Sequence, residues 1–194
     1  FYEQFGKDFD YFSSSIAVNG KDIWIDQHYG SLYRFDGEKL FTYENMGGRL
    51  VSADMEGNVW FWSQSGIARF DGENWTYYGE QDGILPSYRF RSLVFDLDGS
   101  IWLGGSAGIC HFDGTSCQIY RTTDAPSALP GYYIRDIAFG LDGRLWLVSG
   151  TEVYSFGGKE WKNAGLATDI PNMDASQLDI ASNGQVWVDG WIEP

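Results

Sequence analysis

A turn followed by an apolar residue and a tryptophan recurs five times along the 194-residue chain. The tryptophans of successive copies are 36, 42, 44 and 41 residues apart. A period near 40 residues predicts a row of similar supersecondary units, each too small to fold alone. The copies are Gly20-Lys21-Asp22-Ile23-Trp24, Gly57-Asn58-Val59-Trp60, Gly99-Ser100-Ile101-Trp102, Gly143-Arg144-Leu145-Trp146 and Gly184-Gln185-Val186-Trp187.

A second mark follows each of the first four tryptophans, namely Phe35-Asp36-Gly37, Phe70-Asp71-Gly72, Phe112-Asp113-Gly114 and Phe156-Gly157-Gly158. Asp-Gly between alternating apolar residues favours a two-residue type I′ hairpin, which needs positive φ at both central positions. Each unit then holds two hairpin turns and four strands. No window has a sustained 3.6-residue apolar period, so essentially no helix is expected. Four-stranded antiparallel units of this length predict an all-β fold, a β-propeller.

The repeat gives about 4.5 blades, possible parts of a larger ring. An incomplete fifth blade would leave exposed strand edges. Either residues 1–8 close a small five-bladed ring as an outer strand, or more chain or a partner completes it; we favour a fragment of a larger propeller. The expected blades in this single domain are 13–46, 49–79, 91–121, 135–163 and 177–194.

The five repeated tryptophans are expected to be structural. A single four-stranded unit cannot bury both faces of its sheet, so each indole should wedge between neighbouring blades and stabilise them by roughly 2–3 kcal/mol. The alternative is a ladder of rings that stack on sugars. The residues are Trp24, Trp60, Trp102, Trp146 and Trp187.

The segment Asp96–Gly114 resembles the two-component regulator propeller repeat, in which Asp-x-x-Gly-x-Ile-Trp-Leu-Gly precedes Gly-Ile-x-x-Phe-Asp-Gly. Asp54–Gly72 departs from the pattern, with Phe61-Trp62 where aliphatic-Gly is favoured. The resemblance implies a propeller that forms the sensory part of a membrane receptor, often for carbohydrates or their breakdown products. It also implies a periplasmic or extracellular location.

Charge excludes two classes of partner. With 13 Lys and Arg against 27 Asp and Glu, the net charge is −14. Nucleic acid and anionic membrane surfaces both need a basic footprint. No stretch approaches the ~20 apolar residues of a membrane-spanning helix, so direct membrane insertion is not expected.

Function is expected on the rim that carries the connections from second to third strand and from blade to blade, because these loops vary most. Eight residues before the turn glycine, three successive units place Arg49, Arg91 and Arg135. On innermost strands these guanidinium groups could bind a carboxylate or sulfate by paired hydrogen bonds. Alternatively, each pairs with a neighbouring Asp or a backbone carbonyl.

Aromatic residues and one histidine are further ligand-binding candidates on that rim. They could stack on sugars or contact a partner, or simply pack the loops onto the blades. They are Tyr88, Tyr132, Tyr133, Trp191 and His28.

Little in the sequence suggests catalysis. His28 and His111 are the only histidines, and neither a Gly-x-Ser-x-Gly elbow nor a His-Glu-x-x-His pair is present. Asp96–Gly99 resembles part of a calcium-binding loop but lacks the downstream Glu and the 12-residue span. We therefore predict no enzyme, no metal site and no cofactor.

The two cysteines flank the third Phe-Asp-Gly turn. A two-residue loop at Asp113-Gly114 would set Cys110 directly opposite Cys117, so they form either a cross-strand disulfide or two buried thiols. A disulfide would indicate an oxidising compartment.

The leading hypothesis is a non-enzymatic, extracytoplasmic propeller of sensor type that recognises a small anionic or carbohydrate ligand, or a protein. The alternative is a structural or accessory subunit whose rim docks onto an assembly, with a protein partner completing the ring. A propeller enzyme that acts on saccharides through carboxylates is a third hypothesis.

Overall fold

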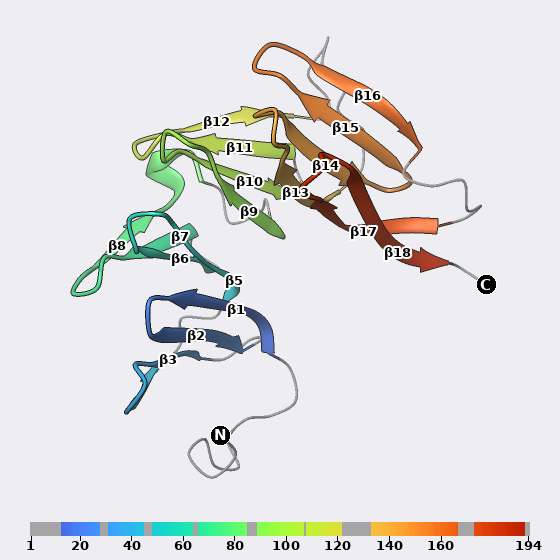
Figure 1. The fold of residues 1–194 in the computed structure, drawn as a ribbon. Helices are drawn as coiled ribbons and strands as arrows, with labels where there is room; N and C mark the ends of the chain where they lie inside the picture. Colours follow the sequence, from blue (N-terminus) through green and yellow to red (C-terminus); the bar gives the residue numbers. More distant parts are fainter. Residues whose placement is uncertain are drawn as a thin grey trace. The chain divides into compact units, whose positions relative to one another are not determined.

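The structure is a computed structural model that describes residues 13–27, 31–44, 48–63, 66–84, 89–106, 108–121, 133–166 and 173–192. These residues form four four-stranded antiparallel sheets and one two-stranded sheet, in chain order (Figure 1). Repeated short apolar runs between glycine turns produce this series. A 3₁₀ turn, η2 (Glu80–Asp82), is the one helical element in the described part of the chain.

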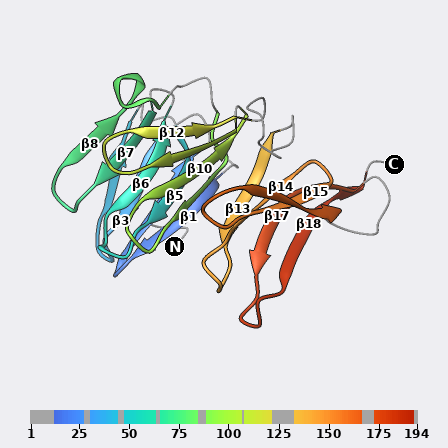
Figure 2. The ribbon, with the colours of Figure 1, turned by 90° about the horizontal axis from the view of Figure 1, so that it is seen from above.

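Each sheet is a simple meander of strands that follow one another in sequence (Figures 1 and 2). Sheet 1 holds β1 (Ser13–Asn19), β2 (Asp22–Gln27), β3 (Leu32–Phe35) and β4 (Leu40–Tyr43). Sheet 2 holds β5 (Gly48–Ala53), β6 (Val59–Ser63), β7 (Gly66–Phe70) and β8 (Trp75–Tyr78). Sheet 3 holds β9 (Ser92–Phe95), β10 (Ile101–Gly105), β11 (Gly108–Phe112) and β12 (Cys117–Tyr120). Sheet 4 holds β13 (Ile134–Phe139), β14 (Leu145–Ser149), β15 (Glu152–Phe156) and β16 (Trp161–Leu166), and sheet 5 holds β17 (Met173–Ile180) and β18 (Val186–Ile192).

The Phe-Asp-Gly turns differ from the expected two-residue hairpins. Phe112 pairs with Cys117, so the loop has four residues. The Asp113 carboxylate accepts the backbone N–H groups of Thr115 and Ser116, both at 2.8 Å. Asp36 and Asp71 make the same pair of bonds in their own loops. The type I′ prediction was wrong because the aspartate favours closing a longer loop through its side chain.

The aspartate that opens the Asp-x-x-Gly-x-x-Trp turn holds the repeated tryptophan. Asp54 accepts the backbone N–H of Asn58 at 2.8 Å and the indole N–H of Trp60 at 2.7 Å. In sheet 3, Asp96 accepts the indole N–H of Trp102 at 3.3 Å. These carboxylates are structural, because each satisfies both a turn amide and a buried indole donor.

The glycine that starts the third strand is required by a close approach of backbone. Gly108 has φ +121°, and a Cβ there would lie 2.1 Å from the carbonyl oxygen of Tyr120 on the fourth strand. Gly66 is in the same situation with Tyr78, at 2.0 Å. Only glycine fits, which explains the Gly-Ile start of the Gly-Ile-x-x-Phe-Asp-Gly segment.

The chain divides into two compact units, residues 1–86 and 87–194. In the first unit β1 lies beside β5. Trp24 is buried there, with its ring centroid 5.3 Å from that of Phe70 and 6.0 Å from that of Trp75 in sheet 2. The indole from one sheet thus packs into the apolar face of the next, which keeps these two sheets together.

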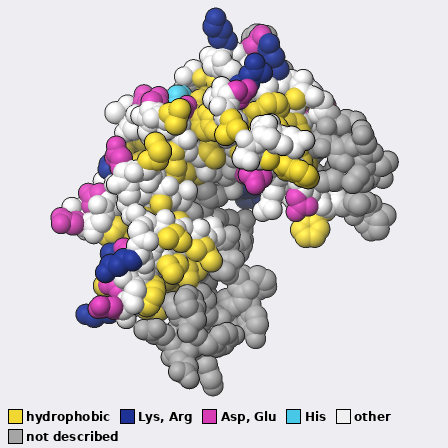
Figure 3. All heavy atoms as spheres, viewed as in Figure 1, with side chains coloured by type: hydrophobic (Ala, Val, Ile, Leu, Met, Phe, Trp, Pro, Cys, Tyr) yellow, Lys and Arg dark blue, Asp and Glu magenta, His cyan; other side chains and the backbone are white. Residues whose placement is uncertain are grey.

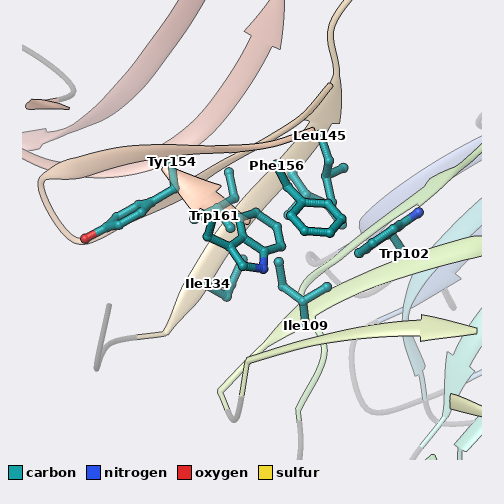
Figure 4. Close-up of a cluster of buried hydrophobic side chains, with 9 residues drawn as sticks. Trp102, Ile109, Ile134, Leu145, Tyr154, Phe156 and Trp161 are labelled. Carbon is teal, nitrogen blue, oxygen red and sulfur yellow. The ribbon is translucent and has the colours of Figure 1, made fainter. Parts of the chain in front are cut away.

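In the second unit β13 lies beside both β9 and β17. A buried apolar cluster there joins sheets 3 and 4 (Figure 4). Phe156 lies between Trp102 and Trp161, at centroid distances of 5.6 and 4.7 Å. Gly104 lets the sheets approach, because a Cβ there would lie 2.7 Å from Ile134.

The two remaining repeated tryptophans are less covered. Trp146 is half-buried against the small cluster between sheets 4 and 5, which is built on Val148, Val153 and Leu178. Trp187 is 62% exposed, because no described strand lies on its face of sheet 5. Residues 1–8, the expected closing strand, lie outside the described residues. Within the described ranges, no helix is long and apolar enough to cross a membrane.

Candidate functional site

The candidate site is one edge of the second unit, which we call the rim. It is formed where β9, β13 and β17 begin and β18 ends. The antiparallel order brings these ends to the same edge, away from the Gly-x-x-Trp turns. The described rim residues used below are Arg91, Tyr133, Arg135, Glu152, Asp174 and Trp191.

An ion pair next to an exposed indole is the most distinctive feature of the rim. Arg135 Nη2 lies 2.5 Å from Asp174 Oδ2, and about a third of each side chain is exposed. Asp174 is directly opposite Trp191 in the β17–β18 register. Trp191 is 74% exposed, so an apolar ring and a partly solvated charged pair lie side by side on the rim.

The predicted arginine trio has different surroundings at each position. Arg135 pairs with an aspartate, which was the alternative to ligand binding. Arg91 is exposed, and its guanidinium makes no hydrogen bond or ion pair with any described residue. Its backbone N–H donates to the Gly104 carbonyl at 2.7 Å. The Arg49 side chain is outside the described part.

Tyr133 is 56% exposed at the start of β13, and its carbonyl accepts the hydroxyl of the buried Ser149 at 3.0 Å. That bond fixes the backbone at Tyr133, immediately before β13 begins. The other predicted aromatic residues of the rim, Tyr88 and Tyr132, and the candidate His28 all lie outside the described residues.

A carboxylate of the rim, Glu152, is held by two neighbours. It accepts the Tyr154 hydroxyl and, at 3.1 Å, the Asn163 side-chain amide. The Tyr154 and Asn163 hydrogen bonds lower the pKa of Glu152, whereas burial and Glu152 raise the pKa of Tyr154. Glu152 is therefore ionised at neutral pH and is an acceptor rather than a proton donor.

Sequence reasoning missed Asp174. Counting eight residues back from the turn glycine reaches Ser176, which occupies the same bulge position in β17 as Arg135 does in β13. An aspartate two residues before that position gave no signal of its own. Only the fold places it between Arg135 and Trp191.

His111 lies away from the rim. Its ring stacks on Trp102 at a centroid distance of 4.1 Å, and its Nε2 is 2.9 Å from Ser100 Oγ. In the residues that the structure describes, no group of three His, Cys, Asp or Glu side chains is placed to hold a metal ion. On the face shown in Figure 3, acidic side chains are scattered among apolar and basic ones.

Cys110 and Cys117 are joined by a disulfide. They are not directly opposite, as a two-residue loop would require, because Cys110 pairs with Ile119 and Phe112 with Cys117. The four-residue loop makes them diagonal neighbours on one face of sheet 3, with Cα atoms 5.6 Å apart.

Comparison with known proteins gives matches in structure only. No protein-family model matches the chain. No curated protein matches it in sequence either. Virginiamycin B lyase from Staphylococcus aureus matches with a TM-score of 0.77 and 17% identity, over 93% of this chain and 64% of the lyase.

Two other solved structures have the same fold. YCF48 bound to D1 peptide matches with a TM-score of 0.68 and 19% identity, over 93% of this chain and 61% of that one. The extracellular domain of the hybrid two-component system BT4673 from B. thetaiotaomicron matches with a TM-score of 0.66 and 13% identity, over 90% of this chain and 25% of that one. The chain thus spans less than two thirds of these structures, and its fold is that of a β-propeller with four-stranded blades.

The lyase corrects one prediction. The scarcity of histidines and the missing nucleophile motifs led to the prediction that the chain is not an enzyme, and this inference was wrong, because an enzyme is built on the same scaffold. Propeller repeats encode blade packing, and catalytic residues can be placed in the loops without altering them. The similarity to the extracellular domain of a two-component system agrees with the expected propeller fold.

Proposed function

We propose that this chain is an extracytoplasmic recognition module of sensor type that binds a carbohydrate or a small anionic ligand on the rim. The observation that carries the proposal is the exposed Trp191 beside the Arg135–Asp174 ion pair. An exposed indole offers a flat apolar face, and the adjacent pair offers both donors and acceptors. Sugars match this surface, because they have an apolar ring face and hydroxyl groups that both donate and accept hydrogen bonds.

Arg91 supports the anionic form of the ligand. It is exposed at the start of β9, and Arg135 is at the start of the adjacent β13. A ligand carboxylate could bind Arg91 directly and share Arg135 with Asp174. Ligands with both a sugar ring and a carboxylate would use every feature of the rim.

Two observations support an extracytoplasmic location. The Cys110–Cys117 disulfide is stable in an oxidising compartment. The similar B. thetaiotaomicron structure is an extracellular domain.

We also propose that the chain belongs to the two-component regulator propeller repeat family. The residues that resemble that repeat have physical roles here, since they include the turn aspartates and the glycines that start the third strands.

The test is isothermal titration calorimetry of the full chain with neutral oligosaccharides and oligouronates. We expect Trp191→Ala to raise the dissociation constant at least tenfold, and Arg135→Gln to weaken oligouronates more than neutral sugars. Leu97→Ala is the matched control, because Leu97 is 86% exposed in a Gly-x-x-Trp turn at the opposite edge. Unchanged affinity in Trp191→Ala, or no binding to either class, would contradict the proposal.

A further inference from the structure

Among the strands that the structure describes, none pairs with the second edge of β18. In the four complete sheets the second strand lies between the first and the third, whereas among the described residues β18 pairs only with β17. An unpaired strand edge presents a row of backbone donors and acceptors that can pair with another strand. Val186 and Val188 pack toward sheet 4, so the opposite face of β18 carries Trp187, Asp189 and Trp191.

In three complete sheets the third strand places a basic side chain or an imidazole over the repeated tryptophan. Each side chain is directly opposite the indole in register. The pairs are Arg34 over Trp24 at 5.6 Å, Arg69 over Trp60 at 5.8 Å, and His111 stacked on Trp102 at 4.1 Å. The two arginine contacts are cation–π interactions.

Each of these basic groups also contacts the residue two positions before the tryptophan. We call the place that holds the basic group a seat. Asp22 accepts Arg34 Nε at 2.7 Å. Asn58 Oδ1 accepts Arg69 Nη2 at 3.0 Å. Ser100 Oγ lies 2.9 Å from His111 Nε2. The seat thus consists of an indole face and the side-chain oxygen of the residue two positions before it.

Sheet 4 departs from this arrangement. Ser155 is opposite Trp146 on the third strand, and the basic residue is Arg144, two positions before the tryptophan. Arg144 instead pairs with Asp142, at 3.3 Å. The repeated tryptophan of sheet 4 therefore has no basic side chain opposite it on the third strand.

Sheet 5 has the indole and the oxygen but no described third strand. Gln185 is two positions before Trp187 and supplies a side-chain carbonyl. Asp179 is directly opposite Trp187 on β17, and both are exposed. This half of the seat is therefore electronegative and accessible.

We propose that β18 binds an extended, arginine-bearing segment of a partner polypeptide by strand addition, with the guanidinium over Trp187 and within reach of Gln185. The partner strand runs antiparallel to β18, as third strands do in the complete sheets. Its residues beside the arginine are apolar, because they lie opposite Val186 and Val188. The chain's own third strands have this pattern, as in Ala68-Arg69-Phe70.

Charge favours a basic partner over a second copy of this chain. Each copy carries a net charge of −14, and pairing two β18 strands would bring together faces that bear Asp179 and Asp189. Like charges across a strand pair are destabilising. The arginine of the proposed partner instead neutralises part of that face.

The probe is a blocked synthetic peptide with the β7 sequence Gly-Ile-Ala-Arg-Phe, titrated into the full chain. Calorimetry gives the affinity, and the indole N–H resonance of Trp187, assigned with Trp187→Phe, reports the site. We expect the same peptide with Gln in place of Arg to bind at least tenfold more weakly. Trp187→Ala and Gln185→Ala should both weaken the arginine peptide.

Trp191→Ala is the matched control, since it removes another strongly exposed indole from the same strand but lies outside the five-residue register. It should leave peptide binding unchanged, which separates this proposal from the one for the rim. Equal affinity for the Arg and Gln peptides, or unchanged affinity in Trp187→Ala, would overturn the proposal. So would a dimer of the chain alone, seen by sedimentation and abolished by Trp187→Ala, because a second copy would then occupy β18.

Discussion

The Asp136 carboxylate on β13 accepts the backbone N–H of Leu178 on β17 at 2.9 Å. Its other oxygen accepts the Ser92 hydroxyl at 2.6 Å, and Ser92 Oγ in turn accepts the Ile137 N–H at 3.2 Å. β9 and β13 thus each provide a side-chain oxygen that accepts a backbone N–H from the first strand of the next sheet. These bonds tie the inner strands of sheets 3, 4 and 5 together at the level of the rim.

Removing this carboxylate should destabilise the second unit. Asp136→Ala leaves the Leu178 amide without its acceptor, and a lost buried hydrogen bond costs about 1–3 kcal/mol. We expect the urea unfolding transition to shift accordingly. Glu160→Ala is the control, because its ion pair with Lys162 is largely exposed and should change stability by less than about 0.5 kcal/mol. Equal effects of the two substitutions would contradict the bridging role.

The glycines that start the third strands, Gly66 and Gly108, should not tolerate a side chain. Gly108→Ala forces a Cβ against the Tyr120 carbonyl in a left-handed conformation, which costs about 1–3 kcal/mol of backbone strain. Gly157→Ala meets no atom within 4 Å and should be neutral or slightly stabilising. Thermal unfolding of both variants, followed by circular dichroism, distinguishes the two outcomes.

The fourth Phe-x-Gly loop can be improved. Gly157 takes the place of Asp36, Asp71 and Asp113, so its loop amides have no carboxylate to accept them. We expect Gly157→Asp to stabilise the chain by about 0.5–1 kcal/mol, the contribution of one modest hydrogen bond. Chemical denaturation measures the gain, and Gly157→Asn tests whether an uncharged acceptor suffices. A lower stability for both variants would show that this loop closes differently.

Acid should weaken the turns in a defined window. Hydrogen bonds from Thr115 and Ser116 lower the pKa of Asp113 from 3.8 to about 2. Since the folded value lies below the unfolded one, the stabilisation is present above pH 4 and is lost as pH falls toward 2. Carboxyl carbon NMR titration should give the low value. Thr115→Ala, which removes the largest contribution, should raise the pKa, and an unchanged pKa would contradict this origin.

The disulfide should contribute measurably despite its short loop. Opening a ring of this size costs about 2–3 kcal/mol in the chain-entropy account. We expect Cys110→Ala/Cys117→Ala and the reduced wild type to lose stability to a similar degree. Mass measurement after alkylation, with and without reductant, checks the bond. Full alkylation of the unreduced protein would contradict it.

The sequence predicted the scaffold well because its signals are local. Turn glycines and the spacing of the tryptophans marked strand boundaries, and the alternation of apolar residues marked the strands. The error at Phe112-Asp113-Gly114 was also local. Asp-Gly is compatible with both a two-residue and a four-residue loop, and the choice depends on side-chain hydrogen bonds that the dipeptide does not reveal.

The candidate site was harder to predict because it depends on contacts between sheets. Arg135 was chosen for its periodic position, but its partner Asp174 is 39 residues away on another sheet, two residues before the position that the periodicity marks. Trp191 was chosen as an aromatic residue of the rim, but the sequence did not predict that Asp174 and Arg135 lie beside it. Periodicity therefore identified positions, whereas the ion pair beside the indole required the fold.

All nine tryptophans lie within the described residues, and the two strongly exposed ones, Trp187 and Trp191, are both on β18. A water-soluble fluorescence quencher such as acrylamide reaches exposed indoles first. The quenchable fraction of the emission therefore reports on this one strand, so occupancy at either end of it can be followed in the unlabelled protein.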